Sequence, residues 1–217
     1  GGRRMTTLVS MRTVLSWLLL VFALGAAAQS VGPPGTSLAG GWRDSLEAYW
    51  AQLDAEYADS STSPLTTEDR SHFTHLDHFP FDSSYCVQAS FTPTEGAEPF
   101  AMKTTKTRTP RYKAHGTLRF TLDGQERTLN VYESVPPHPG YEDALFLPFT
   151  DLTNGDETYG VGRYIDLRMP LDSVVVIDFN RAYNPYCAYN DKYSCPVPPQ
   201  ENHLTTSVRA GVRKFHD

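Results

Sequence analysis

Thiol, amide and carboxylate side chains gather in one irregular C-terminal stretch, residues 178–204. This stretch contains Cys187 and Cys195, together with four tyrosines and four prolines. Proline fixes its backbone angle and lacks the N–H group that helices and sheets use, so a regular helix or strand is excluded here. Such a segment either locks the fold in place or forms the wall of a binding or catalytic site.

The cysteines permit several kinds of chemistry. A disulfide between Cys187 and Cys195 is the first expectation, because such a pair oxidises outside the cytoplasm and the bridge would contribute roughly 2–3 kcal/mol. Two buried reduced thiols, or a metal site with His203 as a third ligand, are the alternatives. Cys187 with His203 as its base would make a thiol nucleophile, although no cysteine-hydrolase signature accompanies them. Cys86 is the odd cysteine and is expected to be a buried free thiol.

A second group of polar residues lies at Arg163, Tyr164 and Asp166, within the sequence GVGRYIDL. On a strand, Arg163 would point to one side, and Tyr164 and Asp166 to the other. An arginine can bind the carboxylate or phosphate of a ligand through two parallel hydrogen bonds. The alternative is an internal ion pair that braces the fold, with Asp178 or Glu201 as the partner.

A third group of polar residues accompanies the prolines of residues 178–204. Asparagine side chains often bond their own backbone in turns, so a structural role is one interpretation. A pocket wall is the other, because ligand sites combine apolar walls with a few placed hydrogen-bonding groups. Asp178 ends a predicted apolar strand, where a buried carboxylate needs a partner. The predicted ligand-binding residues are Arg163, Tyr164, Asp178, Asn180, Tyr183, Asn184, Glu201 and Asn202.

Three histidines, His72, His75 and His78, recur at steps of three residues. A shared metal site would need one helix through all of them, but Pro80 follows immediately and the region looks irregular. They are therefore expected on the surface or at a pocket rim, and no metal site is predicted. Neither a phosphate-binding loop nor the context of a Ser–His–Asp triad occurs, so the sequence indicates no particular cofactor.

The N-terminal residues have the pattern of a secretory signal peptide. Arg12 precedes the apolar residues 14–24, and residues 26–28 form an A-x-A site, so cleavage is expected before Gln29. The apolar run is shorter than the roughly 20 residues of a membrane-spanning helix, and an uncleaved signal anchor is the alternative. We therefore expect residues 1–28 to be removed and the mature protein to be secreted or periplasmic.

Cleavage would also make the chain more acidic. The removed residues contain three arginines and no acidic residue, so the formal net charge changes from −6 to −9. An acidic surface repels nucleic acid and anionic lipid, so neither is expected as a partner, and no membrane association is expected after cleavage.

The elements that must position these groups follow from hydrophobic periodicity. Residues 29–41 are rich in Gly, Pro and Ser and are expected to be a linker. Residues 42–57 carry one apolar stripe at helical spacing, which predicts a helix packed on the core. From Tyr85 onward, alternation predicts strands, with a tight hairpin at Asp123-Gly124. The expected strands are residues 86–91, 100–105, 115–122, 126–132, 146–149, 161–167, 173–179 and 208–215.

One expected strand differs from the others in its composition. Residues 173–179 are almost all apolar, which predicts a central strand covered on both faces. Together these elements predict a mainly β fold, an antiparallel β-barrel or sandwich with an N-terminal α-helix packed on it. Residues 42–217 would form this single domain.

Two long motifs carry a family resemblance. They are residues 145–167, LFLPFTDLTNGDETYGVGRYIDL, and the irregular residues 178–204. With weaker matches at residues 63–65, 78–80 and 112–120, the chain resembles the DUF1684 family of bacterial and archaeal proteins of unknown function. The resemblance implies a shared fold but brings no established reaction, substrate or catalytic residue. It also implies cysteines matching Cys187 and Cys195 in members without a leader, where a disulfide cannot be the reason for them.

Three function classes remain open on the sequence. The first is an exported small-molecule-binding module, with a small acidic ligand paired to Arg163 in a pocket beside residues 178–204. The second is a hydrolase that uses Asp178, Glu201 or Cys187. The third is a structural or protein-interaction domain.

Overall fold

A computed structural model describes residues 36–216 of the chain. The predicted signal peptide and most of the predicted linker lie outside the described residues. The first described element is α1, Thr36–Ala58, which begins within the predicted linker and contains the predicted helix. Among residues 36–216, no helix is both long enough and apolar enough to cross a bilayer.

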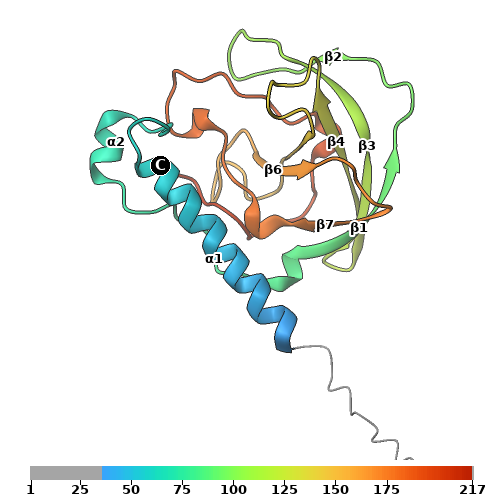
Figure 1. The fold of residues 1–217 in the computed structure, drawn as a ribbon, viewed down its shortest axis with the longest axis horizontal. Coiled ribbons are helices and arrows are strands. Elements are labelled where there is room, and N and C mark those ends of the chain that lie inside the picture. The colour runs from blue at the N-terminus through green and yellow to red at the C-terminus, as the bar shows by residue number, and fades with distance from the viewer. Residues whose placement is uncertain (1–35, 217) are drawn as a thin grey trace, which may run out of the picture. The chain divides into compact units, whose positions relative to one another are not determined.

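The helix α1 packs on the domain through the apolar stripe that the sequence predicted. The side chains of Trp50 and Tyr57 are buried. Trp50 Nε1 donates a hydrogen bond to the carbonyl oxygen of Asn180 at 3.1 Å, and the Tyr49 hydroxyl donates to the carbonyl oxygen of Arg181 at 3.0 Å. The helix therefore lies against the segment at residues 180–181 (Figure 1).

A curved antiparallel sheet, open on one side, forms the body of the protein (Figure 1). Its strands follow the order β6-β5-β4-β3-β1-β7, and β2 pairs with β3 beside this path. The fold is therefore mainly β, a half-barrel rather than a closed barrel. The strands are β1 (Cys86–Pro93), β2 (Phe100–Ala101), β3 (Arg111–Leu122), β4 (Gln125–Ser134), β5 (Ala144–Phe149), β6 (Arg163–Arg168) and β7 (Val174–Asp178). The short helices are α2 (Thr67–His72), η1 (Ser83–Tyr85), η2 (Phe179–Arg181), η3 (Tyr186–Ala188) and η4 (Gln200–Asn202).

The predicted hairpin at Asp123-Gly124 is confirmed as the turn between β3 and β4. Asp123 has φ +52° and Gly124 has φ +69°, as a two-residue turn matched to the twist of its strands requires. The two strands stay paired over their length, apart from an irregularity between Ala114 and Gly116. A Cβ atom at Gly116 would lie 2.3 Å from the ring of Phe91, so glycine permits close packing of β1 on β3 there.

Two strand predictions were wrong. β7 pairs only with β1 and lies at one edge of the sheet, and the side chains of Val174 and Val176 are each 55% exposed. Only the alternate side chains, Val175 and Ile177, reach the core, so an apolar run did not indicate burial on both faces. Residues 208–215 form no strand beyond an isolated bridge between Val212 and His78. Three carbonyls of this segment accept hydrogen bonds from a buried side chain.

The histidines at steps of three residues do not share one helix. α2 ends at His72, before His75 and His78. The ring of His78 stacks between those of Trp50 and Phe81, with ring centroids 5.0 Å and 4.9 Å away. Within the described part of the chain, no group of three or more His, Cys, Asp or Glu side chains is placed to hold a metal ion.

Candidate functional site

Arg163 is fully buried and bonded inside the fold. Its Nη2 atom lies 2.9 Å from Asp151 Oδ2 and 2.7 Å from the carbonyl oxygen of Val208, while Nη1 donates to the carbonyls of Ala210 and Val212. Burial lowers the pKa of the guanidinium, and the Asp151 carboxylate opposes that shift. The guanidinium group that could have bound a ligand therefore forms its hydrogen bonds with groups of the protein. The structure favours the internal ion pair, but with Asp151 as its partner.

Asn202 is a structural residue that extends the sheet. The strands β4 and β5 pair directly only at Tyr132 and Phe146. Beyond this point the Asn202 side chain accepts from Asn130 N at 2.9 Å and donates to the carbonyls of Asn130, at 2.8 Å, and Pro148, at 2.6 Å. One buried amide therefore satisfies three backbone groups of two strands that would otherwise lack partners.

Asn180 and Asn184 are also buried and bonded to main-chain groups. Asn180 Oδ1 accepts from the N–H of Asp82 at 3.0 Å, and its Nδ2 donates to the carbonyl of Asp82 at 2.9 Å. Asn184 Nδ2 donates to the carbonyl of Arg213 at 2.9 Å. The structural interpretation of the asparagines in the irregular stretch is the one that these contacts support.

The two predicted carboxylates have internal partners and lie apart. Asp178 Oδ2 accepts from Trp42 Nε1 at 2.8 Å, and its Oδ1 accepts from the N–H and the side chain of Asn180, at 3.0 and 2.8 Å. Glu201 is exposed and its Oε1 accepts from the Tyr132 hydroxyl at 3.0 Å. Neither carboxylate lines a cavity with the other, so they do not form an acid–base pair.

The three cysteines are free, and Cys187 and Cys195 are not at disulfide distance, so the structure does not show the predicted disulfide. The N–H of Cys187 donates to Cys195 Sγ at 3.1 Å, and the Tyr159 hydroxyl lies 3.5 Å from Cys187 Sγ. A hydrogen bond from the Cys195 thiol lowers the pKa of Cys187 to about 6 and raises that of Cys195. His203 does not join them, because its Nδ1 lies 3.0 Å from Thr150 Oγ1.

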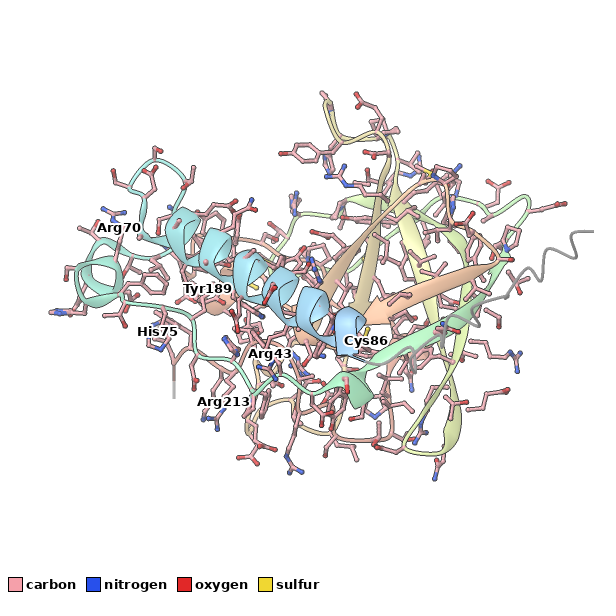
Figure 2. The ribbon with its side chains drawn as sticks, turned by 60° about the horizontal axis from the view of Figure 1, so that its bottom comes forward. Arg43, Arg70, His75, Cys86, Tyr189 and Arg213 are labelled. Carbon is pink, nitrogen blue, oxygen red and sulfur yellow. The ribbon has the colours of Figure 1, made fainter. Side chains whose placement is uncertain are left out.

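Cys86 is the first residue of β1 and lies beside the first turns of α1 (Figure 2). Its side chain is only partly buried, unlike the predicted fully buried thiol. Burial and the nearby Asp178 carboxylate raise the pKa of Cys86, so this thiol differs from Cys187 in its acidity.

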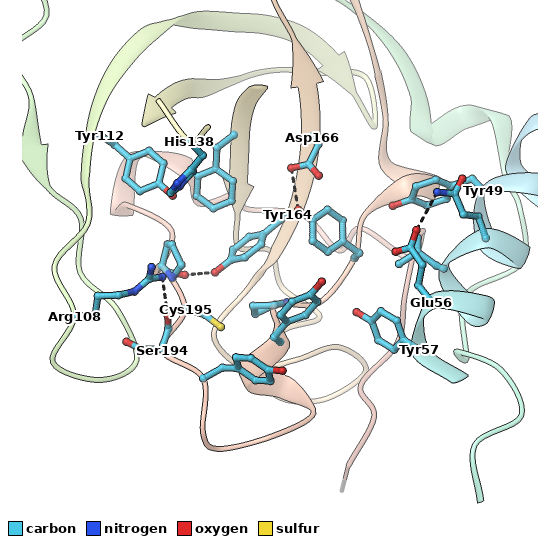
Figure 3. A pocket seen from close by; sticks show the side chains of 18 residues that line it. Tyr49, Glu56, Tyr57, Arg108, Tyr112, His138, Tyr164, Asp166, Ser194 and Cys195 are labelled. Atoms are coloured by element: carbon cyan, nitrogen blue, oxygen red, sulfur yellow. Dashed lines mark hydrogen bonds between the residues drawn. The ribbon is translucent and has the colours of Figure 1, made fainter. Parts of the chain in front are cut away.

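A cavity of about 470 Å³ opens between β6, the irregular C-terminal stretch and α1 (Figure 3). We call it the tyrosine pocket, because seven tyrosines line it. The polar lining includes Asp166, Glu56, Arg108 and His138. The tyrosines are Tyr49, Tyr57, Tyr112, Tyr164, Tyr183, Tyr186 and Tyr193.

Several elements that are distant in sequence build this pocket. α1 contributes Tyr49 and Tyr57, β3 contributes Tyr112, and β6 contributes Tyr164. The irregular stretch contributes the other three tyrosines, so its prolines and turns shape a wall of the cavity. On β6, Tyr164 and Asp166 both face the pocket, as the alternation of side chains along a strand predicted.

A hydrogen-bonded carboxylate–phenol pair lies in the pocket. The Tyr183 hydroxyl donates to Asp166 Oδ1 at 2.8 Å. The Asp166 side chain still meets solvent, yet the aromatic walls remove enough water to raise the pKa of its carboxyl, against the lowering effects of Tyr183 and Arg168. Burial and the Asp166 carboxylate raise the pKa of Tyr183 well above its ordinary value, so its phenol stays protonated and can donate.

Among the predicted binding residues, only Tyr164 and Tyr183 line the tyrosine pocket. The location beside β6 and the irregular stretch matches the sequence prediction, but most of the chosen polar residues are structural. Sequence reasoning missed the contribution of α1, because Tyr49 and Tyr57 looked like core residues of its apolar stripe. Glu56 was the available signal, since it places a polar side chain next to that stripe.

Comparisons with known proteins place this fold among proteins without an assigned function. The solution NMR structure of an uncharacterized protein of Haloarcula marismortui is 37% identical in sequence and has a TM-score of 0.65. That match covers 81% of this chain and 95% of the other chain. No curated protein matches this chain. Residues 71–213 match the family described as "Protein of unknown function (DUF1684)", so the chain belongs to the DUF1684 family.

Proposed function

We propose that the protein binds a small organic molecule in the tyrosine pocket. The observation that carries the proposal is the cavity itself, in which aromatic walls and a few polar groups converge. Its volume of about 470 Å³ lies within the range of roughly 300–1,000 Å³ that is typical of ligand sites. Tyrosine suits such a wall, because its ring offers an apolar face and its hydroxyl a hydrogen bond.

An acidic ligand, as the sequence led us to expect, needs a different partner in this pocket. Arg163 is enclosed by Asp151 and backbone carbonyls and has no path to a ligand. Arg108, by contrast, is exposed and lines the pocket, with its Nη2 atom 2.9 Å from the carbonyl of Ser194. If the ligand carries an acidic group, Arg108 is therefore the partner that the pocket offers it.

The hydrolase alternative has less support from the geometry. Asp178, Glu201 and Cys187 do not line the tyrosine pocket. The oxygens of Asp178 are held by Trp42 and Asn180, which leaves the carboxylate little capacity for proton transfer. A purely structural role does not explain why aromatic walls and polar groups converge on an open cavity.

Export of the protein belongs to the same proposal. Its support is the signal-peptide pattern at the N-terminus and the acidic charge that would remain after cleavage. The bound molecule would then be one that occurs outside the cytoplasm. N-terminal sequencing of the protein recovered from the exported fraction should begin at Gln29, and an intact N-terminus there would contradict cleavage.

The test of ligand binding is a screen of small fragments with neutral, cationic and anionic members. Binding would be followed by chemical-shift changes of pocket residues in NMR spectra of the mature chain. Tyr186→Ala should weaken the best fragment about tenfold, because Tyr186 is 45% exposed and offers its ring to the pocket.

Phe100→Ala is the matched control, since Phe100 is 37% exposed and lies outside the pocket. This variant should bind the fragment as the wild-type protein does. If no fragment of any charge shifts pocket resonances, or if both variants lose binding equally, the proposed function is wrong.

A further inference from the structure

The carboxylate of Asp166 retains unused hydrogen-bonding capacity. Its Oδ1 accepts from the Tyr183 hydroxyl, and among residues 36–216 no basic side chain forms an ion pair with it. Arg168, which is next on the same face of β6, pairs instead with Asp143 at 2.6 Å and lies over the ring of Tyr141. A carboxylate can accept about four hydrogen bonds, so most of its acceptor sites remain open to a ligand.

Aromatic side chains lie beside this carboxylate on β5, on β6 and in the irregular stretch. Phe146 is paired with Asp166 across the β5–β6 ladder, and Tyr164 is its neighbour on the same face of β6. The ring centroid of Tyr164 lies 4.6 Å from that of Phe146, with the rings at 75°, and 5.9 Å from that of Tyr183, with the rings at 89°. The rings therefore pack edge to face on one another, and the ring faces that this packing leaves free can attract a cation, as in an aromatic cage.

The pocket also contains one further carboxylate and one guanidinium group. Glu56 adds a second carboxylate from α1, where it accepts from Gln52 Nε2 at 2.9 Å. Arg108 lies with Ser194 on a different wall from Asp166 (Figure 3). The cage around Asp166 therefore combines a negative charge with ring faces, both of which attract a cation.

We propose that Asp166, with the rings of Phe146, Tyr164 and Tyr183, binds the positively charged nitrogen of a small organic ammonium compound. The inference rests on the proposed function, since it names the ligand chemistry of the same pocket. The cation lies over the ring faces and forms an ion pair with the open oxygen of Asp166. A neutral ligand of the same shape keeps the apolar contacts but loses both electrostatic attractions.

The pKa of Asp166 agrees with this assignment. The aromatic surroundings raise the pKa of its carboxyl, although the side chain still meets solvent, so its charged form is less well solvated than in water. A bound ammonium group would provide that partner. A carboxylate with a shifted pKa and an open oxygen in a pocket is a candidate for a functional group.

The first experiment compares choline with 3,3-dimethylbutan-1-ol, its uncharged isostere. Isothermal titration calorimetry and NMR titration of the mature protein measure both affinities at low salt. Choline should bind at least about tenfold more tightly than the isostere, because only the quaternary nitrogen interacts with the ring faces and with Asp166.

The second experiment removes the charge of the carboxylate. Asp166→Asn keeps the shape of the side chain and an acceptor for the Tyr183 hydroxyl, and it should reduce the preference for choline to less than about threefold. Glu126→Gln is the control, because Glu126 is an exposed carboxylate paired with Arg119 on the β3–β4 hairpin. That control should preserve the full preference.

Two outcomes distinguish failure of this inference from failure of the proposed function. If choline and its isostere bind equally, and Asp166→Asn does not change this, the ammonium assignment is overturned. The proposal that the pocket binds a small molecule would not be affected. The ammonium assignment is also overturned if other fragments shift pocket resonances and choline does not. If no fragment and neither probe shifts these resonances, both proposals are wrong.

Discussion

The strand β6 carries Arg163 and Asp166 only three residues apart, yet the two side chains have opposite surroundings. Arg163 is fully buried, with Asp151 and three backbone carbonyls around its terminal nitrogens. Asp166 lies in an open pocket and has one hydrogen bond, from Tyr183. Both belong to the polar group that the sequence shows in GVGRYIDL, but only Arg163 was predicted to bind a ligand.

The different hydrogen bonding of these two residues gives a general criterion for interpreting a cluster of polar side chains. A polar side chain whose hydrogen bonds all go to the protein stabilises the fold, and one with spare capacity in a cavity can bind a ligand. By this criterion Asn180 and Asn202 belong with Arg163 on the structural side. Their substitution should affect stability, whereas substitution of Asp166 should affect binding.

The largest expected effect is that of Arg163→Met. Methionine preserves much of the apolar volume but leaves Asp151 as a buried charge without its partner, which typically costs about 3–5 kcal/mol. We expect the free energy of unfolding in urea to fall by about that amount. Arg213→Met is the control, because Arg213 is exposed and its ion pair with Asp77 should contribute less than about 1 kcal/mol. If the Arg163→Met protein is stable but fails to bind ligand, Arg163 would be a ligand-binding residue and not a structural one.

The next effect is that of Asn202→Ala. The change leaves the N–H and carbonyl of Asn130 and the carbonyl of Pro148 without their side-chain partner. A buried polar group without a partner costs about 1–3 kcal/mol, so we expect a loss of at least about 2 kcal/mol in urea unfolding. Hydrogen exchange should also become faster at Asn130, between β4 and β5. A loss below about 0.5 kcal/mol would show that water replaces the amide.

Much of the fold could be predicted, because its signals are local. The β3–β4 hairpin follows from alternation and from Asp123-Gly124, and α1 follows from its apolar stripe. The edge position of β7 could not be predicted, since Val174 and Val176 look like core residues until strand order is known. Residues 208–215 also alternate as a strand does, but their carbonyls accept from Arg163, which only the tertiary structure brings there.

The tyrosine pocket lies beside the two segments to which the sequence assigned a ligand site, but most of its lining residues were not named. Tyr164 and Tyr183 were identified because they lie in the two motifs that have unusual composition. Arg163 was misread because Asp151, its partner, lies twelve residues upstream in a region without a charge pattern that would mark it. Tyr57 was assigned to the core alone, since an apolar stripe that borders a cavity looks like one that only packs on the core, and the neighbouring Glu56 was the signal that distinguishes them.

The thiols extend the comparison to reactivity. Because the hydrogen bond from Cys195 lowers the pKa of Cys187, this residue should have a larger thiolate fraction at pH 7 than Cys86, whose pKa is raised. Iodoacetamide at pH 7 should therefore modify Cys187 roughly tenfold faster than Cys86, as followed by peptide mass spectrometry. Cys195→Ala should slow the reaction of Cys187 by removing its hydrogen bond. Equal rates for Cys187 and Cys86 would contradict the assigned pKa directions.

The smallest expected effect is that of Asp166→Asn on stability. It has the opposite sign to the effect of Arg163→Met, because it should stabilise the fold. The pKa of Asp166 is higher in the folded protein than in the unfolded chain, so the folded state binds the proton more tightly. The carboxyl therefore costs no stability below its unfolded pKa of about 3.9, and stability falls as pH rises through the folded pKa. Asp166→Asn should raise the Tm slightly at pH 7, by roughly a degree or two, and leave it unchanged near pH 3.

A stability gain that accompanies a loss of choline binding would mark Asp166 as a residue kept for binding at a cost in stability. Glu126→Gln again serves as the control, since its exposed carboxylate should alter neither the Tm at pH 7 nor binding. A marked fall in Tm on Asp166→Asn would instead show that the carboxylate stabilises the fold. Asp166 would then be a structural residue like Arg163, and the contrast between these two residues of β6 would disappear.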